Sequence, residues 1–355
     1  MNNINMFLSQ KIKVISFVCI IMVLYIHSDF HEVEGEILGM NINILCQKII
    51  SKKIARCAVP LFFSISGFLF FSKMNNGLKS VWLKIKKRFR SLFIPYVIGC
   101  ITYVLFILLL ECIPSASKYI NDHTIINCFD SPNLDVLEYV FWATPESGQP
   151  WAFHLWFLRD LIIIVLFSPL LFVFRRYKVF LFSYFAIVFL LRCNDTFLPS
   201  IYISLFWFLL GSVFLNKIEL SRNGTIILLF IYILCLFSEV YYEDYFLEKI
   251  DLVLKIIGCV LVWNLYDLFI SVKFDLKEHR LLCASTEFTF FIYVFHEPYF
   301  NIIRKGMIMV VGKTELGFLL TYLTSPWICA VFLISCGYLL RKKYSRFYRI
   351  CVGGR

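Results

Sequence analysis

The sequence predicts an all-α, polytopic membrane protein with about ten transmembrane helices and both termini in the cytoplasm. Three observations support this fold class. First, 60% of the 355 residues are hydrophobic and only 17% are charged, whereas soluble domains average about 45–50% apolar and about 25% charged residues. Second, the apolar residues gather in segments long enough to cross a bilayer. Third, the basic residues concentrate in alternate loops between those segments.

Ten apolar segments approach the length of about 20 residues that a helix needs to cross the hydrocarbon core. We expect one integral-membrane domain over residues 1–355, with helices at about 12–30, 55–72, 91–112, 152–174, 179–193, 197–215, 224–241, 250–270, 284–303 and 316–339. Many of the thirteen cysteines lie inside these segments, and none shows metal-ligand spacing. We therefore expect small buried hydrophobic side chains and no metal site.

The distribution of Lys and Arg predicts the orientation. With ten helices, 23 basic residues fall on the side of the N-terminus and 9 on the opposite side. Because cytoplasmic loops carry an excess of basic residues, both termini are predicted to be cytoplasmic. The net charge of +11 then comes from cytoplasmic loops, and no nucleic-acid partner is expected.

The first segment carries an ionisable residue at membrane depth. Residues 14–30 have the sequence VISFVCIIMVLYIHSDF, in which His27 interrupts a run of apolar side chains. Such a residue costs roughly 2.5 kcal/mol or more on insertion scales, and histidine is the side chain best suited to proton transfer near neutral pH. His27 therefore indicates chemistry at the membrane, unless it only lies at the interface. Asp29 and His31 follow it directly.

The second segment opens with Arg56 and continues CAVPLFFSISGFLFF. A cation so close to the hydrocarbon needs a partner or a use. Pro60 predicts a break in the first turn, and small residues such as Ser66 and Gly67 allow close helix contact. Because neighbouring helices alternate in direction, Arg56 and His27 are expected near the same outer ends and hence close together.

A basic stretch precedes the third segment. Residues 73–90 interleave Lys and Arg with apolar side chains such as Trp82 and Phe89, so a helix here would lie along the inner membrane surface. One interpretation is an anchor on anionic lipid. The other is that its basic residues, Lys87 and Arg88 among them, draw a phosphate-bearing donor such as coenzyme A to the cytoplasmic face. The opposite loop 113–150 is acidic and is expected to be solvated.

Polar residues also mark the fourth and ninth segments. In HLWFLRDLI, residues 154–162, Arg159 either pairs with the adjacent Asp160 or contacts substrate. Trp156 in the same stretch is either an interfacial aromatic, since Trp favours that depth, or a substrate contact. In YVFHEP, His296 is either an interfacial residue ahead of the helix-ending Pro298 or part of the site.

Four stretches together resemble the integral-membrane acyltransferase-3 family, whose members typically O-acylate cell-surface polysaccharides. They are the first segment ending in His27, RCAVPLFFSISGFLF from Arg56, RFRSLFIPY of residues 88–96, and HLWFLRDLI combined with STEFTFFIYVFHEP of residues 285–298. They extend from the first to the ninth segment, and ten helices is also the number in the family. One position departs: many members carry Arg or Lys where this chain has Ser16, and Lys13, about one turn earlier, is the candidate replacement.

The resemblance implies an enzyme that transfers an acyl group, most often acetyl, from a cytoplasmic acyl-CoA to a hydroxyl of a cell-surface or lipid-linked polysaccharide. In such a reaction His27 is the candidate base or transient acyl carrier, and Arg56 is the candidate cation that orients a carbonyl or phosphate. The candidate substrate contacts are Ser66, Trp156, Arg159 and His296, and the candidate donor contacts are Lys87 and Arg88. We expect no permanently bound cofactor and a multi-pass location in the bacterial plasma membrane, among lipids.

Two other function classes fit parts of the sequence. A transporter or flippase of a lipid-linked saccharide needs a polar route and broken helices, which Arg56, Pro60 and Gly67 would supply, but it needs no reactive base. A receptor or purely structural protein needs no essential ionisable residue within the membrane. Binding of an acyl donor separates the enzyme from both.

Overall fold

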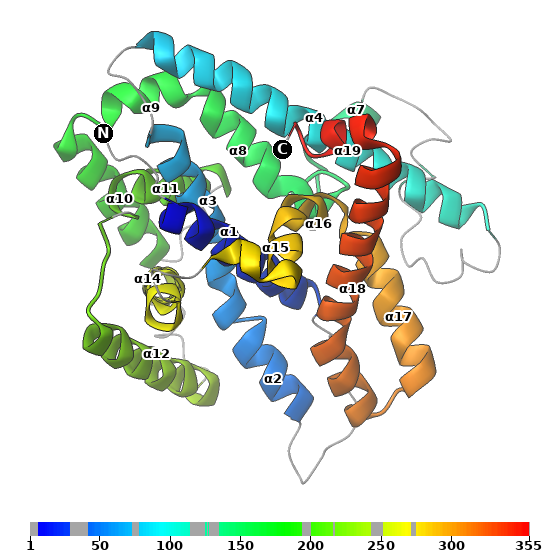
Figure 1. Ribbon diagram of the computed structural model, residues 1–355. Coiled ribbons are helices and arrows are strands. Elements are labelled where there is room, and N and C mark those ends of the chain that lie inside the picture. Colours follow the sequence, from blue (N-terminus) through cyan, green and yellow to red (C-terminus); the bar gives the residue numbers. More distant parts are fainter. Residues whose placement is uncertain are drawn as a thin grey trace.

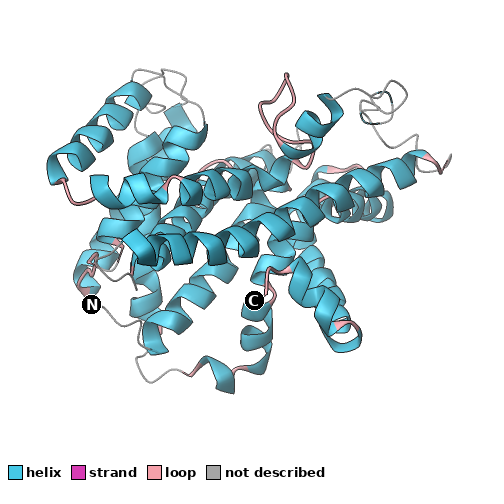
Figure 2. Ribbon diagram, turned by 90° about the horizontal axis from the view of Figure 1, so that it is seen from above, coloured by secondary structure: helices cyan, strands magenta, loops and turns pink. Residues whose placement is uncertain are grey.

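The computed structural model describes residues 6–28, 42–72, 78–113, 125, 127, 135–193, 200–215, 217–242, 251–270 and 275–354. Within those ranges the chain forms helices and no strand (Figure 2). The predicted all-α class is therefore confirmed. Asp29, His31 and much of the acidic loop 113–150 lie outside the described residues.

Helices of membrane-spanning length alternate with short ones. In chain order the described helices are α1 (Met6–His27), α2 (Ile42–Ile50), the 3-10 helix η1 (Ile54–Cys57), α3 (Ala58–Phe71), α4 (Leu78–Glu111), α7 (Asp135–Phe141), η2 (Phe153–Leu155), α8 (Trp156–Leu166), α9 (Ser168–Phe174), α10 (Lys178–Cys193), α11 (Ser200–Phe214), α12 (Arg222–Tyr242), α14 (Asp251–Phe269), η3 (Leu276–Glu278), α15 (Arg280–Glu287), α16 (Thr289–Phe295), α17 (Tyr299–Val311), α18 (Glu315–Lys343) and α19 (Ser345–Cys351).

Length and composition identify the segments that can cross a membrane. Among the described residues, five segments are long and apolar enough, and a bent pair, α8 with α9, makes a sixth if it is one span. The five are Met6–His27, Ile42–Phe71, Lys79–Glu111, Asp251–Phe269 and Glu315–Lys343. Shorter apolar helices lie at Lys178–Leu191, Ser200–Phe214 and Arg222–Ser238. The chain is a multi-pass membrane protein, and the number of ten spans stays a prediction.

Two of the predicted segments, 152–174 and 284–303, are broken rather than straight. Helices α8 and α9 are bent by 64°, and Pro169 stands in the first turn of α9. Proline lacks the N–H donor, and its ring clashes with the preceding turn. The other segment is divided among α15, α16 and α17, with Pro298 as the N-cap of α17. These breaks let the chain place polar residues inside the protein.

The basic stretch and the third segment form one continuous helix, α4, which crosses the top of the molecule in Figure 1. At 1.5 Å per residue its 34 residues extend about 51 Å, which exceeds a hydrocarbon core of about 30 Å. Trp82 and Leu83 on its basic half are exposed. We expected the basic stretch to lie on the membrane surface, separate from the third span. The structure instead joins the basic stretch and the span in one helix.

Helices α3 and α11 make the closest helix–helix contact at small residues. A Cβ added to Gly67 would lie 1.9 Å from the carbonyl oxygen of Phe208, and one added to Gly211 would lie 2.1 Å from that of Ser64. The Ser64 Oγ donates a hydrogen bond to the Trp207 carbonyl at 3.1 Å. The close contact predicted from the SISG sequence is confirmed for Ser64 and Gly67.

Helix α1 lies near the centre of the molecule (Figure 1) and packs against α3, α14, α16 and α18. Its N-terminal part is fixed by Lys11, which is 4% exposed, forms an ion pair with Asp267 and lies over the ring of Trp263. The Gln10 amide donates to Asp275 at 3.2 Å. These contacts hold one end of the helix whose other end carries His27.

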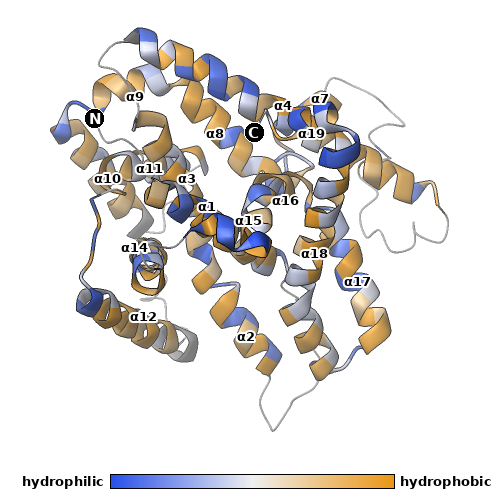
Figure 3. Cartoon of the chain, viewed as in Figure 1, coloured by the Kyte–Doolittle hydropathy of each residue, from blue (hydrophilic) through white to orange (hydrophobic). Residues whose placement is uncertain are grey.

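The outer helices expose apolar side chains. On α12, for example, Ile226, Ile227 and Phe230 are exposed, and most of the helix α12 in Figure 3 has the colour of hydrophobic residues. An apolar surface of this extent is unusual on a soluble monomer. In a multi-pass membrane protein it is the surface that faces lipid.

Candidate active site

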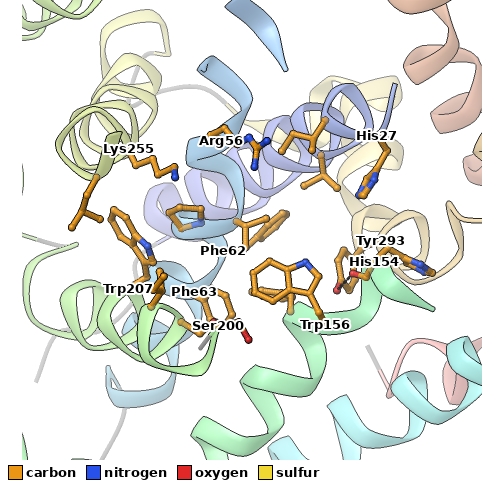
Figure 4. A pocket seen from close by; sticks show the side chains of 18 of the residues that line it. His27, Arg56, Phe62, Phe63, His154, Trp156, Ser200, Trp207, Lys255 and Tyr293 are labelled. Carbon is orange, nitrogen blue, oxygen red and sulfur yellow. Dashed lines mark hydrogen bonds between the residues drawn. The ribbon is translucent and has the colours of Figure 1, made fainter. Parts of the chain in front are cut away.

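A cavity of about 290 Å³ lies at the C-terminal end of α1 (Figure 4). It is lined by His27 from α1, Arg56 from η1, His154 from η2 and Trp156 from α8. We call it the histidine cavity. His27 and Arg56 thus line the same space, as expected, but Arg56 lies near the middle of the apolar segment Ile42–Phe71 and not at its outer end. Its volume lies near the lower end of the range of small-molecule sites, about 300–1,000 Å³.

Three histidines from distant parts of the chain form a cluster beside this cavity. The ring centroids of His27 and His296 are 5.2 Å apart, and those of His154 and His296 are 4.8 Å apart. His296 is fully buried and His154 nearly so. His296 does not line the cavity itself, but its ring lies next to the rings of the two histidines that do.

Backbone carbonyls determine which ring nitrogen carries the proton in two of these histidines. The Nδ1 of His296 lies 2.9 Å from the carbonyl oxygen of Tyr293, and the Nε2 of His154 lies 3.1 Å from that of Val294. A carbonyl oxygen only accepts, so both nitrogens must donate. The other nitrogens, Nε2 of His296 and Nδ1 of His154, then carry lone pairs; both are buried and have no partner among the described residues.

The backbone at the end of α1 is held by a neighbouring helix. Arg304 of α17 donates a hydrogen bond from Nη1 to the carbonyl oxygen of His27. The last carbonyls of a helix lack intrahelical partners, so this bond stabilises the terminus. Two residues before His27, the Tyr25 hydroxyl donates a hydrogen bond to the Leu323 carbonyl of α18 at 3.0 Å. The end of α1 that carries His27 is thus held by α17 and α18.

Arg56 presents an available cation to the histidine cavity. Its side chain is exposed and makes no hydrogen bond or ion pair with the residues that the structure describes. Lys255, which also lines this cavity, forms an ion pair with Asp251 one helical turn away. Figure 4 shows His27, His154 and Tyr293 together at one end of the cavity and Lys255 at the other. An anionic group or a developing negative charge would therefore meet Arg56.

A second cavity, of about 350 Å³, follows the N-terminal half of α1. Lys13 and Ser16 of α1, Ser66 of α3 and Arg88 of α4 line it; we call it the basic cavity. Lys13, proposed above as the replacement for the basic residue missing at Ser16, thus faces the same space as Ser16. Glu287 is the acidic residue on its wall, and it is paired with Arg341 at 2.7 Å.

The two cavities lie end to end along α1. Lys13 and His27 are 14 positions apart, which corresponds to about 21 Å of helix at 1.5 Å per residue. The cavities share three lining residues, Phe62, Phe157 and Tyr293. These three aromatic rings therefore lie where the two cavities meet.

Three candidates line neither cavity: His296, Arg159 and Lys87. Arg159 donates to the carbonyl oxygens of Trp142 at 2.6 Å and Gly148 at 2.9 Å. It also donates to Asp160 at 3.1 Å. Its contacts thus fasten the turn after α7 to α8, which agrees with the ion-pair alternative. Lys87 is exposed on the surface of α4.

Other residues of the site carry a weaker sequence signal or none. Asp251 and Lys255 are oppositely charged, four residues apart and at the start of an apolar segment, which is a recognisable pattern. Trp207 and Tyr293 line the histidine cavity, yet each is one aromatic among many in an apolar segment. Among the described residues, no group of three or more His, Cys, Asp or Glu is arranged to hold a metal ion.

Comparisons with known proteins identify the family of the chain. The family model described as an acyltransferase domain matches residues 11–340. A relative, the succinoglycan biosynthesis protein ExoH of Rhizobium meliloti (strain 1021), is 24% identical over 364 aligned residues, which include 98% of this chain and 92% of the relative. No solved structure matches the chain. Because the family model covers nearly the whole chain, the protein belongs to the acyltransferase-3 family and is a membrane O-acyltransferase.

Proposed function

We propose that this enzyme takes an acyl group, most often acetyl, from acyl-CoA on the cytoplasmic side and transfers it to a hydroxyl of a cell-surface or lipid-linked polysaccharide. The observation that carries the proposal is the pair of cavities along α1. One has basic residues at its wall, the other has the histidine cluster, and they abut at three shared side chains. The family match favours this enzyme over the transporter considered above.

The basic cavity is our proposed donor site. Coenzyme A carries phosphates, and Arg and Lys are the side chains that bind them. Lys13 and Arg88 line the cavity, and Lys87, the exposed neighbour of Arg88 on α4, is proposed to meet the nucleotide outside. The space of about 350 Å³ suits the pantetheine arm with its thioester. Glu287 does not oppose this charge because Arg341 neutralises it.

The histidine cavity is our proposed reaction site, with His27 as general base. His27 takes the proton of the acceptor hydroxyl while the hydroxyl oxygen attacks the thioester carbonyl carbon. The tetrahedral oxyanion then faces Arg56, whose guanidinium has no other partner among the described residues. The carbon–sulfur bond breaks, and the thiolate of CoA leaves with the proton that His27 held. The products are the ester and free CoA.

His296 is proposed to orient the base. Its Nε2 is a buried lone pair without a partner in the described residues, and the His27 ring is its neighbour at 5.2 Å between centroids. An N–H of His27 directed at this lone pair leaves the other nitrogen of His27 as the base. This is the role that an orienting carboxylate has beside a catalytic histidine in serine hydrolases.

The acceptor is proposed to enter the histidine cavity between aromatic walls. Trp156 and Trp207 line it, and indole rings combine an apolar face with a polar N–H, which suits a sugar ring with its hydroxyls. The relative is named for the biosynthesis of succinoglycan, and this supports a polysaccharide acceptor here. We place the protein in the bacterial plasma membrane with both termini in the cytoplasm.

The test is acyl transfer by purified protein in detergent. Labelled acetyl-CoA and de-O-acylated succinoglycan oligosaccharide serve as probes, and both released CoA thiol and labelled glycan are measured. His27→Ala should lower the rate by about 10²–10⁴-fold, the usual cost of losing a general base. His279→Ala is the matched control, because His279 is exposed and lines neither cavity. Near-wild-type turnover of folded His27→Ala would refute the assignment of His27 as the general base.

A further inference from the structure

Three aromatic rings form the boundary between the basic cavity and the histidine cavity. Phe62 comes from α3, Phe157 from α8 and Tyr293 from α16, and among the described residues these three alone line both cavities. The ring centroids of Phe62 and Phe157 are 5.9 Å apart, and those of Phe157 and Tyr293 are 5.6 Å apart. The rings are thus in contact in series, with Phe157 in the middle.

Two of the three rings are held in place. The Tyr293 hydroxyl donates a hydrogen bond to the His154 carbonyl at 2.9 Å, which fixes that ring to the helix turn that carries a cluster histidine. Phe157 is 7% exposed and packs against Phe63 with centroids 4.4 Å apart. Phe62 is only partly buried. The width of any passage is therefore set by two fixed rings and one partly exposed ring.

Ordinary core packing does not explain this arrangement. Protein interiors are filled at close to crystal density, with few voids larger than a water molecule. Here the same three side chains have cavities of about 290 Å³ and about 350 Å³ on their two sides. Three rings from three helices thus converge as a thin partition between two open spaces.

We propose that Phe62, Phe157 and Tyr293 form an aromatic partition that selects the acyl group by its width. The inference rests on the proposed function, in which the thioester passes from the basic cavity to His27. The β-alanine–cysteamine end of the pantetheine arm and an acetyl group are both unbranched and share one narrow cross-section, whereas a methyl branch beside the carbonyl widens it. The partition admits the first and rejects the second, because a wider group meets the fixed rings of Phe157 and Tyr293.

The test is a competition between acetyl-CoA and isobutyryl-CoA with de-O-acylated succinoglycan oligosaccharide as acceptor. The measured quantity is the ratio of the two kcat/KM values. Wild-type protein should favour acetyl, and Phe157→Ala should shift the ratio toward isobutyryl by about tenfold or more, the usual discrimination from one methylene-sized contact. Phe62→Ala should shift it in the same direction, and since Phe62 is partly buried, this variant keeps the test valid if Phe157→Ala does not fold.

Phe290→Ala is the matched control. Phe290 is an equal-sized ring on α16 that lines the basic cavity but not the histidine cavity. The ratio of the two kcat/KM values in Phe290→Ala should therefore stay within about twofold of wild type. An active wild type whose ratio is unchanged in both partition variants overturns the partition and leaves the proposed function intact. An equal shift in Phe290→Ala also overturns it. A wild type that transfers neither acyl group refutes the proposed function, and the partition with it.

Discussion

Replacing Gly67 by Ala should separate α3 from α11 and destabilise the protein. The new Cβ would lie 1.9 Å from the carbonyl oxygen of Phe208, whereas real Cβ contacts are essentially never shorter than 3.0 Å. The helices must therefore move apart by about 1 Å in a closely packed interior. Overpacking usually costs about 1–3 kcal/mol. We expect the upper end of that range, because a backbone oxygen cannot rotate away as a side chain can.

The separation of α3 from α11 should also alter the active site. Helix α3 follows Arg56 directly and carries Phe62, while α11 carries Trp207, and all three residues line the histidine cavity. The loss of thermal stability is measured as the melting temperature in detergent by fluorescence-detected size exclusion, and acyl transfer is measured on the folded fraction. We expect both to fall.

Gly306→Ala provides the control for this prediction. Gly306 lies in α17, and a Cβ added there meets nothing within 4 Å. The substitution should be neutral or stabilise by about 0.5–1 kcal/mol, because Ala favours the helix over Gly. Equal melting temperatures for Gly67→Ala and Gly306→Ala would refute the reasoning about the α3–α11 contact.

Three further predictions concern the site and the orientation. Arg56→Lys keeps the charge but loses the planar fork of donors, so kcat/KM should fall by about 10–10² per folded molecule; Lys and Ala variants that both retain wild-type activity would leave only a structural role. His296→Phe keeps a ring but removes the Nε2 lone pair, so kcat should fall about 10- to 100-fold with little change in KM, and an unchanged kcat and pH profile would contradict the orienting role. On a cysteine-free background, Ser147→Cys should be labelled from outside the cell and Arg346→Cys should not, and the reverse pattern would overturn the orientation.

Much of the fold follows from composition, because a helix is the simplest way to satisfy every backbone group within an apolar segment of spanning length. His27 and Arg56 were found for a related reason: an ionisable residue at membrane depth is costly, so it stands out. Their closeness was expected from the alternating direction of neighbouring helices, whereas the cavity that both line was not. These inferences need only local sequence and the dimensions of a bilayer.

The breaks and the histidine cluster needed the three-dimensional structure. Pro169 and Pro298 mark two helix starts, yet α15 ends and α16 begins at Phe288, where the sequence has no Pro or Gly signal. The contact of His296 with His154 depends on how α16 packs against η2, through bonds to backbone carbonyls. Backbone carbonyls are present at every residue, so the sequence contains no sign of which one a histidine will meet.

In the proposed mechanism the acyl group crosses the membrane through the two cavities along α1. A sided assay in proteoliposomes tests it most directly, with orientation established by protease access to the C-terminal tail. Labelled acetyl-CoA is supplied on one side and de-O-acylated succinoglycan oligosaccharide on the other. We predict labelled glycan only when acetyl-CoA is on the side of the termini and the glycan is on the opposite side. Labelling that requires both substrates on the same side would contradict this path for the acyl group.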